Sequence, residues 1–145
     1  MSESKAAPNQ LEVAAPGDAL ALRAIVAGHG DFATGLISAV EQITGRGGML
    51  IPITVLGLCL DDIEDLLREK MRSTGVRVIF TDLQAGSCTM AARRLLRGTP
   101  GAVLIAGANL PTLLDFVFAD GAPTDAARHA AERGRAALTV HEAPA

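Results

Sequence analysis

Hydrophobic and polar positions along the chain follow two alternating periods, one typical of buried strands and one typical of helices. Compact apolar runs, each followed by a turn or a helical pattern, predict four strands. These runs cover residues 20–27, 49–56, 76–81 and 102–106, and residues 136–140 form a short fifth candidate. Because the second run is apolar almost throughout, its strand should be covered on both faces of the sheet.

Helical patterns and helix-end signals occupy the segments between these runs. From residue 31 or 32 to residue 44, Phe32, Leu36, Val40 and Ile43 recur on one helical face, and Gly45 follows as a stop signal. A second helix is predicted over residues 61–72, and a third begins with Ser87 as its N-cap and ends near residue 97. A fourth has Asn109 as its N-cap and Pro111 in its first turn. The last has Thr124 as its N-cap and ends near residue 134.

Strands that alternate with helices at short spacing predict an α/β domain whose parallel sheet carries helices on both faces. Among the topologies that right-handed crossovers allow, we predict a doubly wound, four-stranded sheet with strand order 2-1-3-4. In that order the winding reverses between the first and third strands, so the turns after these two strands flank one crevice. Chemistry is therefore expected at the carboxyl ends of these strands.

The length of 145 residues suits one domain with a sizeable core. Hydrophobic residues make up 49% of the chain and charged residues 20%, which is the composition of a globular protein and not of a disordered one. We divide the chain into a flexible leader (1–18), rich in Ala, Pro, Glu and Ser, a single domain (19–141) and a short tail (142–145).

Composition and charge argue against several classes of function. The net charge is -3 and only 3% of residues are aromatic, so the chain offers neither a basic surface nor stacking platforms for nucleic acid. The longest apolar run, residues 49–60, is interrupted by Pro52 and Gly57 and is shorter than the roughly 18 apolar residues of a membrane span. Cys59 and Cys88 are too few for a disulfide framework or a zinc site, and no secretory signal is visible, so we expect a cytoplasmic protein.

His29 is the strongest candidate for chemistry. It lies between Gly28 and Gly30, where the first apolar run ends and a helical pattern begins. An imidazole titrates near neutral pH and is a competent nucleophile. The plainer interpretation is a histidine that caps a turn, but flanking glycines remove side chains around the ring and let a bulky partner approach. We therefore favour a functional role.

Asp82 is the natural second member of the site, because it ends the third strand and would face His29 across the crevice. A carboxylate that accepts a hydrogen bond from one ring nitrogen fixes the tautomer and leaves the other nitrogen as the nucleophile. The alternative is a turn residue that caps the loop 83–86. We predict the His29–Asp82 pair as the catalytic constellation.

An anion site is predicted where the third helix begins. Backbone N–H groups of Gly86, Ser87 and Cys88 at a helix N-terminus attract anions, and the Ser87 hydroxyl adds a donor. Ordinary N-capping by Ser87 is the alternative, and the two roles are compatible.

A rival motif is Gly28-x-Gly30-x-x-Ala33, which formally matches a dinucleotide fingerprint. The match is weak, because the ribose-binding acid expected after the second strand is missing and residues 55–57 read Val-Leu-Gly. A histidine inside the glycine turn would also crowd a pyrophosphate.

Other polar and reactive side chains have plainer interpretations. We interpret Cys88 as a small packing residue, although a helix N-terminus can also make a thiolate reactive. His129 is expected on a solvated helix face. Arg93 and Arg94 are expected on another such face, where they could also meet a partner.

Three segments at predicted strand ends resemble the mannose-family enzyme IIA proteins of the bacterial sugar phosphotransferase system (PTS). Residues 25–36 (IVAGHGDFATGL) resemble the phosphorylation segment of that family, residues 81–87 (TDLQAGS) its second motif and residues 107–111 (GANLP) its third. The resemblance covers about residues 21–140, with the motifs in the family's order.

The resemblance implies a phosphoryl carrier. A histidine matching His29 accepts a phosphoryl group from phospho-HPr, the phosphocarrier protein, and passes it to enzyme IIB for sugar uptake. The membrane components IIC and IID take part only indirectly. An aspartate matching Asp82 hydrogen-bonds the histidine, and Gly86 and Ser87 match the segment that holds the phosphate, to which we add Gly30.

The resemblance further implies a homodimer in which a C-terminal strand is exchanged, with residues 136–140 as the candidate strand. Such a relay needs no cofactor and no metal, since phosphoryl transfer asks mainly for positioning and charge stabilisation. The sugar itself is chosen by the membrane components, so the sequence does not name it.

The chain departs from the family pattern beside the predicted phosphate site. Ala85 replaces the first glycine of a pair, and residues 88–90 (Cys-Thr-Met) stand where the family usually has a proline, an aromatic residue and an asparagine. Two alternatives to transport therefore stay open. One is a regulatory phosphoprotein of the same fold, and the other is a nucleotide- or phosphate-binding module without phosphoryl chemistry.

Overall fold

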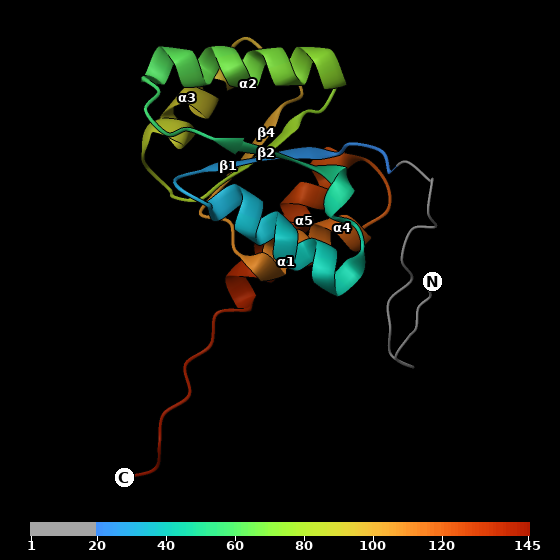
Figure 1. Ribbon diagram of the computed structural model, residues 1–145. Coiled ribbons are helices and arrows are strands. Elements are labelled where there is room, and N and C mark those ends of the chain that lie inside the picture. The colour runs from blue at the N-terminus through green and yellow to red at the C-terminus, as the bar shows by residue number, and fades with distance from the viewer. Residues whose placement is uncertain (1–19) are drawn as a thin grey trace.

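Four parallel strands form one sheet at the centre of the molecule, in a computed structural model that describes residues 20–145 (Figure 1). The strand order β2-β1-β3-β4 is the predicted one, so the doubly wound topology is confirmed. In register, Gly28 lies beside Thr54, and Thr81 lies between Ala27 and Ala106. The strands are β1 (Ala24–Gly28), β2 (Leu50–Thr54), β3 (Val78–Thr81) and β4 (Val103–Ala106).

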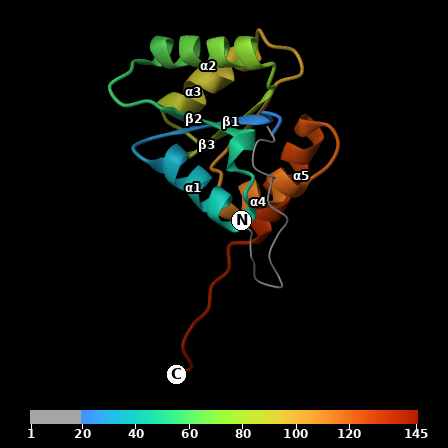
Figure 2. The same cartoon turned by 45° about the vertical axis from the view of Figure 1, so that its right-hand side comes forward.

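Helices cover both faces of this sheet. Figures 1 and 2 show α2 and α3 on one face and α1, α4 and α5 on the other. The helices are α1 (Phe32–Thr44), α2 (Leu60–Thr74), α3 (Ser87–Leu96), α4 (Leu110–Phe118) and α5 (Pro123–Ala136), and a short 3-10 turn, η1 (Gly47–Met49), precedes β2. The predicted α/β class with helices on both faces is therefore confirmed.

Two hydrophobic layers hold the helices on the sheet, because successive strand residues point to opposite faces. In β3, Phe80 packs towards α1, α4 and α5 and meets Phe116 edge-on at a ring-centroid distance of 5.0 Å. Ile79 packs in the other layer with Leu67 of α2 and Leu95 of α3. Both layers are fully buried at these positions, so the central strands are rigid supports for the turns that follow them.

The strands are shorter than the apolar runs that predicted them. β1 begins at Ala24 and not at residue 20, and β3 begins at Val78 and not at residue 76. Val76, before β3, is apolar because it is buried although it has no ladder partner, whereas Leu22, before β1, is 45% exposed, so apolar character there did not indicate a strand.

Two predicted helix caps are wrong. The N-cap of α3 is Gly86, with a φ of 115° that favours glycine, and Ser87 is the first helical residue without a side-chain cap. The last helix begins at Pro123, one residue before the predicted cap Thr124, because proline is already set for the first helical position. Asn109 is confirmed as a cap, since its side chain accepts the backbone N–H of Thr112 at 3.0 Å.

The predicted final strand at residues 136–140 is not formed in this chain. α5 continues to Ala136, and the segment after it has no regular structure and leaves the domain (Figure 1). Leu138 and Val140 are 84% and 82% exposed. A strand needs a hydrogen-bonded neighbour, and this segment meets none among the residues that the structure describes, 20–145.

The predicted leader, residues 1–18, lies outside the described residues. Within residues 20–145, every helix is too short or too polar to span a bilayer.

Candidate active site

His29 occupies the turn between β1 and α1, at the carboxyl edge of the sheet. Gly28 is required here, because a Cβ atom at that position would lie 2.9 Å from Asp82 Oδ2 and 2.6 Å from the Phe32 ring. Gly30 has a φ of 51°, in the left-handed region that reverses the chain into the helix. The flanking glycines thus allow a tight turn that brings the imidazole against the end of β3.

Asp82 follows β3 and contacts His29 twice through a single oxygen. The backbone N–H of His29 donates to Asp82 Oδ2 at 2.8 Å, and the ring atom Nδ1 lies 2.8 Å from the same oxygen. The imidazole is 55% exposed, whereas the carboxylate is only 11% exposed. The predicted pairing across neighbouring strands is therefore present, with the acid behind the ring and the ring open to solvent.

The ionisation of Asp82 decides which ring nitrogen carries the proton. Burial raises the pKa of the Asp82 carboxyl. The hydrogen bonds from the backbone and ring of His29, together with the attraction of the His29 charge, lower this pKa by more than burial raises it, so it lies below its ordinary value. An ionised carboxylate only accepts hydrogen bonds, so Nδ1 must donate to Oδ2. This tautomer leaves the lone pair of the ring on Nε2.

The N-terminus of α3 lies directly beside the ring. A Cβ atom at Gly86 would be 3.6 Å from His29 Cε1, so the imidazole edge faces this glycine. The first helical hydrogen bond is donated by Met90 to the Gly86 carbonyl. The N–H groups of Ser87, Cys88 and Thr89 therefore have no helical acceptor, and none elsewhere among residues 20–145. Such a terminus is suited to binding an anion.

Two buried threonine hydroxyls meet beneath the loop between Asp82 and Gly86, where Thr89 makes the short bond to the loop, and neither residue was among the predicted site residues. The hydroxyls of Thr81 and Thr89 lie 2.7 Å apart, and the Thr89 hydroxyl donates to the Leu83 carbonyl at 2.5 Å. Strand alternation offered a signal for Thr81, since it places residue 81 on the same face as Ile79, towards α3.

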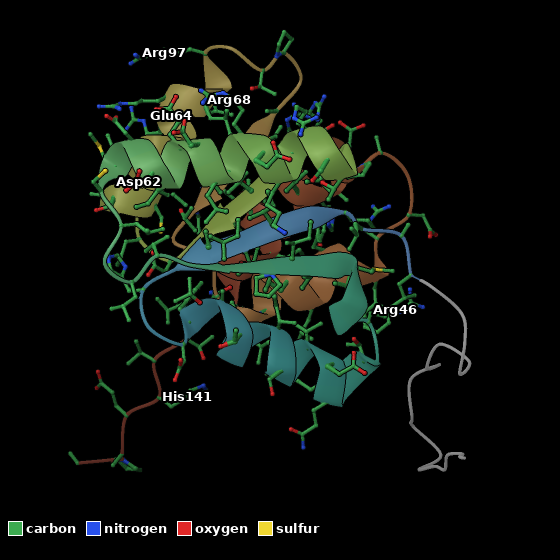
Figure 3. All side chains as sticks on the ribbon, turned by 45° about the horizontal axis from the view of Figure 1, so that its top comes forward. Arg46, Asp62, Glu64, Arg68, Arg97 and His141 are labelled. Carbon is green, nitrogen blue, oxygen red and sulfur yellow. The ribbon has the colours of Figure 1, made fainter. Side chains whose placement is uncertain are left out.

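Exposed apolar side chains surround this edge of the molecule. Leu83 is 53% exposed beside Gly86, and Met90 is 51% exposed one helical turn further on. The loop after β2 adds the exposed Leu56 and Leu58. Acidic residues begin α2 at the same edge, where Figure 3 shows Asp62, while Arg46 lies at the opposite end of the molecule.

Cys88 is buried beneath the site. Its burial, with a smaller contribution from the charge of Asp82, raises the pKa of the thiol to about 11. It is therefore a protonated packing residue at neutral pH, as the sequence interpretation has it, whereas Cys59 is exposed.

The remaining candidates lie on exposed helix faces, but two of them have partners. His129 Nδ1 lies 2.8 Å from Asp115 Oδ2, and its side chain is 66% exposed. Arg94 contacts Asp61 at 2.8 Å and so joins α3 to α2. No group of three or more His, Cys, Asp or Glu side chains is arranged to hold a metal within residues 20–145.

Comparison with protein families identifies the chain. A family model described as the fructose IIA component of the PTS matches residues 23–132. The chain belongs to this IIA family. The matched segment includes β1 through most of α5 and contains both His29 and Asp82. Comparison with curated proteins finds no match.

Solved structures of IIA proteins share the fold. The mannose/sorbose-specific IIA subunit from Enterococcus faecalis is 20% identical, with a TM-score of 0.73 over 87% of this chain and 98% of that one. The PTS IIA protein associated with the fucose utilization operon of Streptococcus pneumoniae is 18% identical, with a TM-score of 0.70 over 81% of this chain and 91% of that one. The PTS component EIIA from Streptococcus agalactiae is 19% identical, with a TM-score of 0.72 over 82% and 96%.

The lowered pKa of Asp82 predicts a pH dependence of stability. A carboxyl whose pKa is lower in the folded state contributes stability above its unfolded pKa, about 3.9, and loses it as the pH falls through the folded value. We therefore expect the free energy of unfolding of the wild type to fall more steeply below about pH 4 than that of Asp82→Asn. Urea unfolding between pH 3 and pH 7 measures both curves, and parallel curves would contradict the prediction.

Proposed function

We propose that this IIA protein is a phosphoryl carrier, which accepts a phosphoryl group from phospho-HPr on His29 and passes it to enzyme IIB in the cytoplasm. The observation that carries the proposal is the 2.8 Å contact between His29 Nδ1 and an ionised Asp82, beside the free N–H groups of α3. Family membership supports the class of reaction. The donor, the acceptor and the residue roles are our inference from the site.

The transfer step uses Nε2 of His29. Its lone pair attacks the phosphorus while the bond from phosphorus to the donor breaks and its electron pair returns to the donor. The ring keeps its proton on Nδ1 and gains positive charge, which the Asp82 carboxylate stabilises at 2.8 Å. Passing the group to enzyme IIB reverses these events, so no proton need leave Nδ1.

The start of α3 is the proposed phosphate site. Three N–H groups without acceptors, those of Ser87, Cys88 and Thr89, favour the negative oxygens of a phosphoryl group on the neighbouring ring. The exposed Ser87 hydroxyl and the Gly30 backbone are further proposed donors. The turns at residues 28–31, 82–87 and 107–109 contain no Lys or Arg, which suits a group that must be passed on.

The surroundings of His29 suit docking of a protein rather than a sugar. The exposed Leu56, Leu58, Leu83 and Met90 supply apolar contact area at the site edge. Their exposure is consistent with a surface that HPr and enzyme IIB cover in turn. On this proposal the sugar contacts only the membrane components, and the IIA protein passes its phosphoryl group to enzyme IIB and not to them.

A homodimer with exchanged C-terminal segments is also proposed. β4 is an edge strand whose four residues are all half-buried, and a groove of about 420 Å³ follows it between Leu104 and Leu138. An open strand edge readily pairs with another strand. Residues 136–140 of a second copy would supply that strand and bury the exposed Val140.

Phosphorylation of His29 is the first test. Incubation with enzyme I, HPr and phosphoenolpyruvate should add one acid-labile phosphate to the wild type, and His29→Ala should abolish it. His129→Ala is the matched control, because His129 has the same 2.8 Å carboxylate contact but lies within a helix instead of beside a helix N-terminus. Intact mass and peptide mapping measure the product.

The result separates the alternatives. Labelling that survives His29→Ala would refute the assignment. A phosphoprotein that transfers to no enzyme IIB would support the regulatory alternative, and nucleotide binding without any phosphoprotein would support the binding module.

Removing the charge of Asp82 should slow transfer. In Asp82→Asn an amide oxygen still accepts the backbone N–H of His29, so the fold should persist, but the charge behind the ring is lost. We expect the rate of phosphorylation to fall on the order of a hundredfold. Rapid-quench measurement of phosphoryl transfer from phospho-HPr checks this, and an unchanged rate would remove Asp82 from the mechanism.

The dimer has its own test. Sedimentation should give the wild type twice the mass of its chain, and removal of residues 137–145 should give a monomer, because the edge of β4 loses its added strand. Val140→Asp, at a position 82% exposed in the single chain, should weaken the dimer in the same direction. A monomeric wild type, or a dimer that persists after truncation, would contradict the proposal.

A further inference from the structure

The loop that joins β3 to α3 carries both the acid behind His29 and the glycine beside it. Residues 83–85 are exposed and, among residues 20–145, they make no backbone–backbone hydrogen bond. Backbone hydrogen bonds hold only the two ends of the loop, at Thr81 in β3 and at the Gly86 carbonyl, which accepts the N–H of Met90. Between these ends, side-chain hydroxyls supply the hydrogen bonds to the loop.

The Leu83 carbonyl is the point at which the loop is held. The Thr89 hydroxyl donates to it at 2.5 Å, and the Thr81 hydroxyl lies 3.5 Å from it. Because the Thr89 proton is used on this carbonyl, the 2.7 Å contact between the two hydroxyls assigns Thr81 as donor to Thr89. Both threonines are buried, at 0% and 2% exposure, so water does not compete for these bonds.

We propose that Thr89 is a positioning residue for phosphoryl transfer: its hydroxyl fixes the Leu83 carbonyl and thereby sets Asp82 and Gly86 against the His29 ring. The inference rests on the proposed function for its kinetic consequence. Thr89 does not touch the ring, since its hydroxyl is engaged with Leu83 and Thr81. It acts one residue away from Asp82, whose Oδ2 sets the tautomer of His29.

This role belongs to the side chain and not to the helix. Thr89 is the third residue of α3, where its backbone N–H has no helical acceptor in any case. Valine at this position keeps the shape of the side chain and removes the hydroxyl, which leaves the Leu83 carbonyl only the Thr81 hydroxyl, 3.5 Å away in the wild type. Serine keeps the hydroxyl and removes one methyl group.

The kinetic test compares Thr89→Val with Thr89→Ser. For transfer from phospho-HPr, we expect Thr89→Val to lower kcat about tenfold, because small misplacements of reacting groups are costly, and to leave KM unchanged, because a buried residue meets no partner. Thr89→Ser should stay within about threefold of the wild type. Thr81→Val is the matched control, since it removes a buried hydroxyl but leaves the bond from Thr89 to Leu83 in place, and its kcat should also stay within about threefold.

A second readout needs no phosphoryl transfer. Ring-nitrogen NMR spectra of the unphosphorylated protein should show His29 as the Nδ1–H tautomer in the wild type and in Thr89→Ser, and as a mixture of tautomers in Thr89→Val. A residue that only stabilises the fold would not change the tautomer of an exposed ring. If valine prevents folding, Thr89→Ala takes its place with the same expectations, since alanine favours the helix.

Equal kcat values for Thr89→Val and the wild type, an equal loss in Thr89→Ser, or an unchanged tautomer in Thr89→Val would overturn the proposal. A wild type that is never phosphorylated would refute the proposed function alone, because the tautomer measurement still decides the role of Thr89.

Discussion

A single carboxylate oxygen, Oδ2 of Asp82, receives two N–H groups of His29, and the arrangement of the site depends on this double contact. The backbone contact holds the turn after β1 against the end of β3. The ring contact leaves the lone pair on the outer nitrogen. Both contacts require the two strands to be neighbours and residue 28 to have no side chain, since a Cβ atom there would collide with the same oxygen.

The order of the strands supplies the remaining parts of the site. Because β1 and β3 are adjacent and parallel, the helices that follow them start at the same edge of the sheet. The beginning of α3 thus reaches the imidazole, and its free N–H groups lie where negative charge would be carried. The fully buried strands beneath make this edge stiff, whereas the loop 83–85 needs the hydroxyl of Thr89 to hold it.

The site is open in a way that suits a relay between proteins. More than half of the imidazole is exposed, and the loop and helix after β3 expose the apolar side chains of Leu83 and Met90. The thiol of Cys88 lies close enough to Asp82 to sense its charge, but burial keeps this thiol protonated. His29 therefore combines an exposed ring nitrogen with a carboxylate behind it and a helix N-terminus beside it, whereas His129, in the second His–Asp pair, lies within α5.

Much of this could be predicted from the sequence, because the period of the apolar residues reports burial directly. The four strands, their alternation with helices and the turn at His29 follow from local pattern, and the strand order is one of the few topologies that the rules of parallel sheets allow. The pairing of His29 with Asp82 needed only that order. Strand ends and caps such as Ser87 were less certain, because backbone torsion at Gly86 decides where α3 begins.

Only the tertiary structure decided which groups touch. The use of one oxygen for two contacts, the clash that excludes a side chain at Gly28 and the bond from Thr89 to Leu83 join residues far apart in the chain or hidden inside the core. The fate of residues 136–140 is of the same kind, since a strand exists only where another strand is available to pair with it. The sequence determined which residues are apolar, small or reactive. The packing of the sheet determined which of them meet, because the pattern of neighbouring residues along the chain does not specify which distant residues lie close in space.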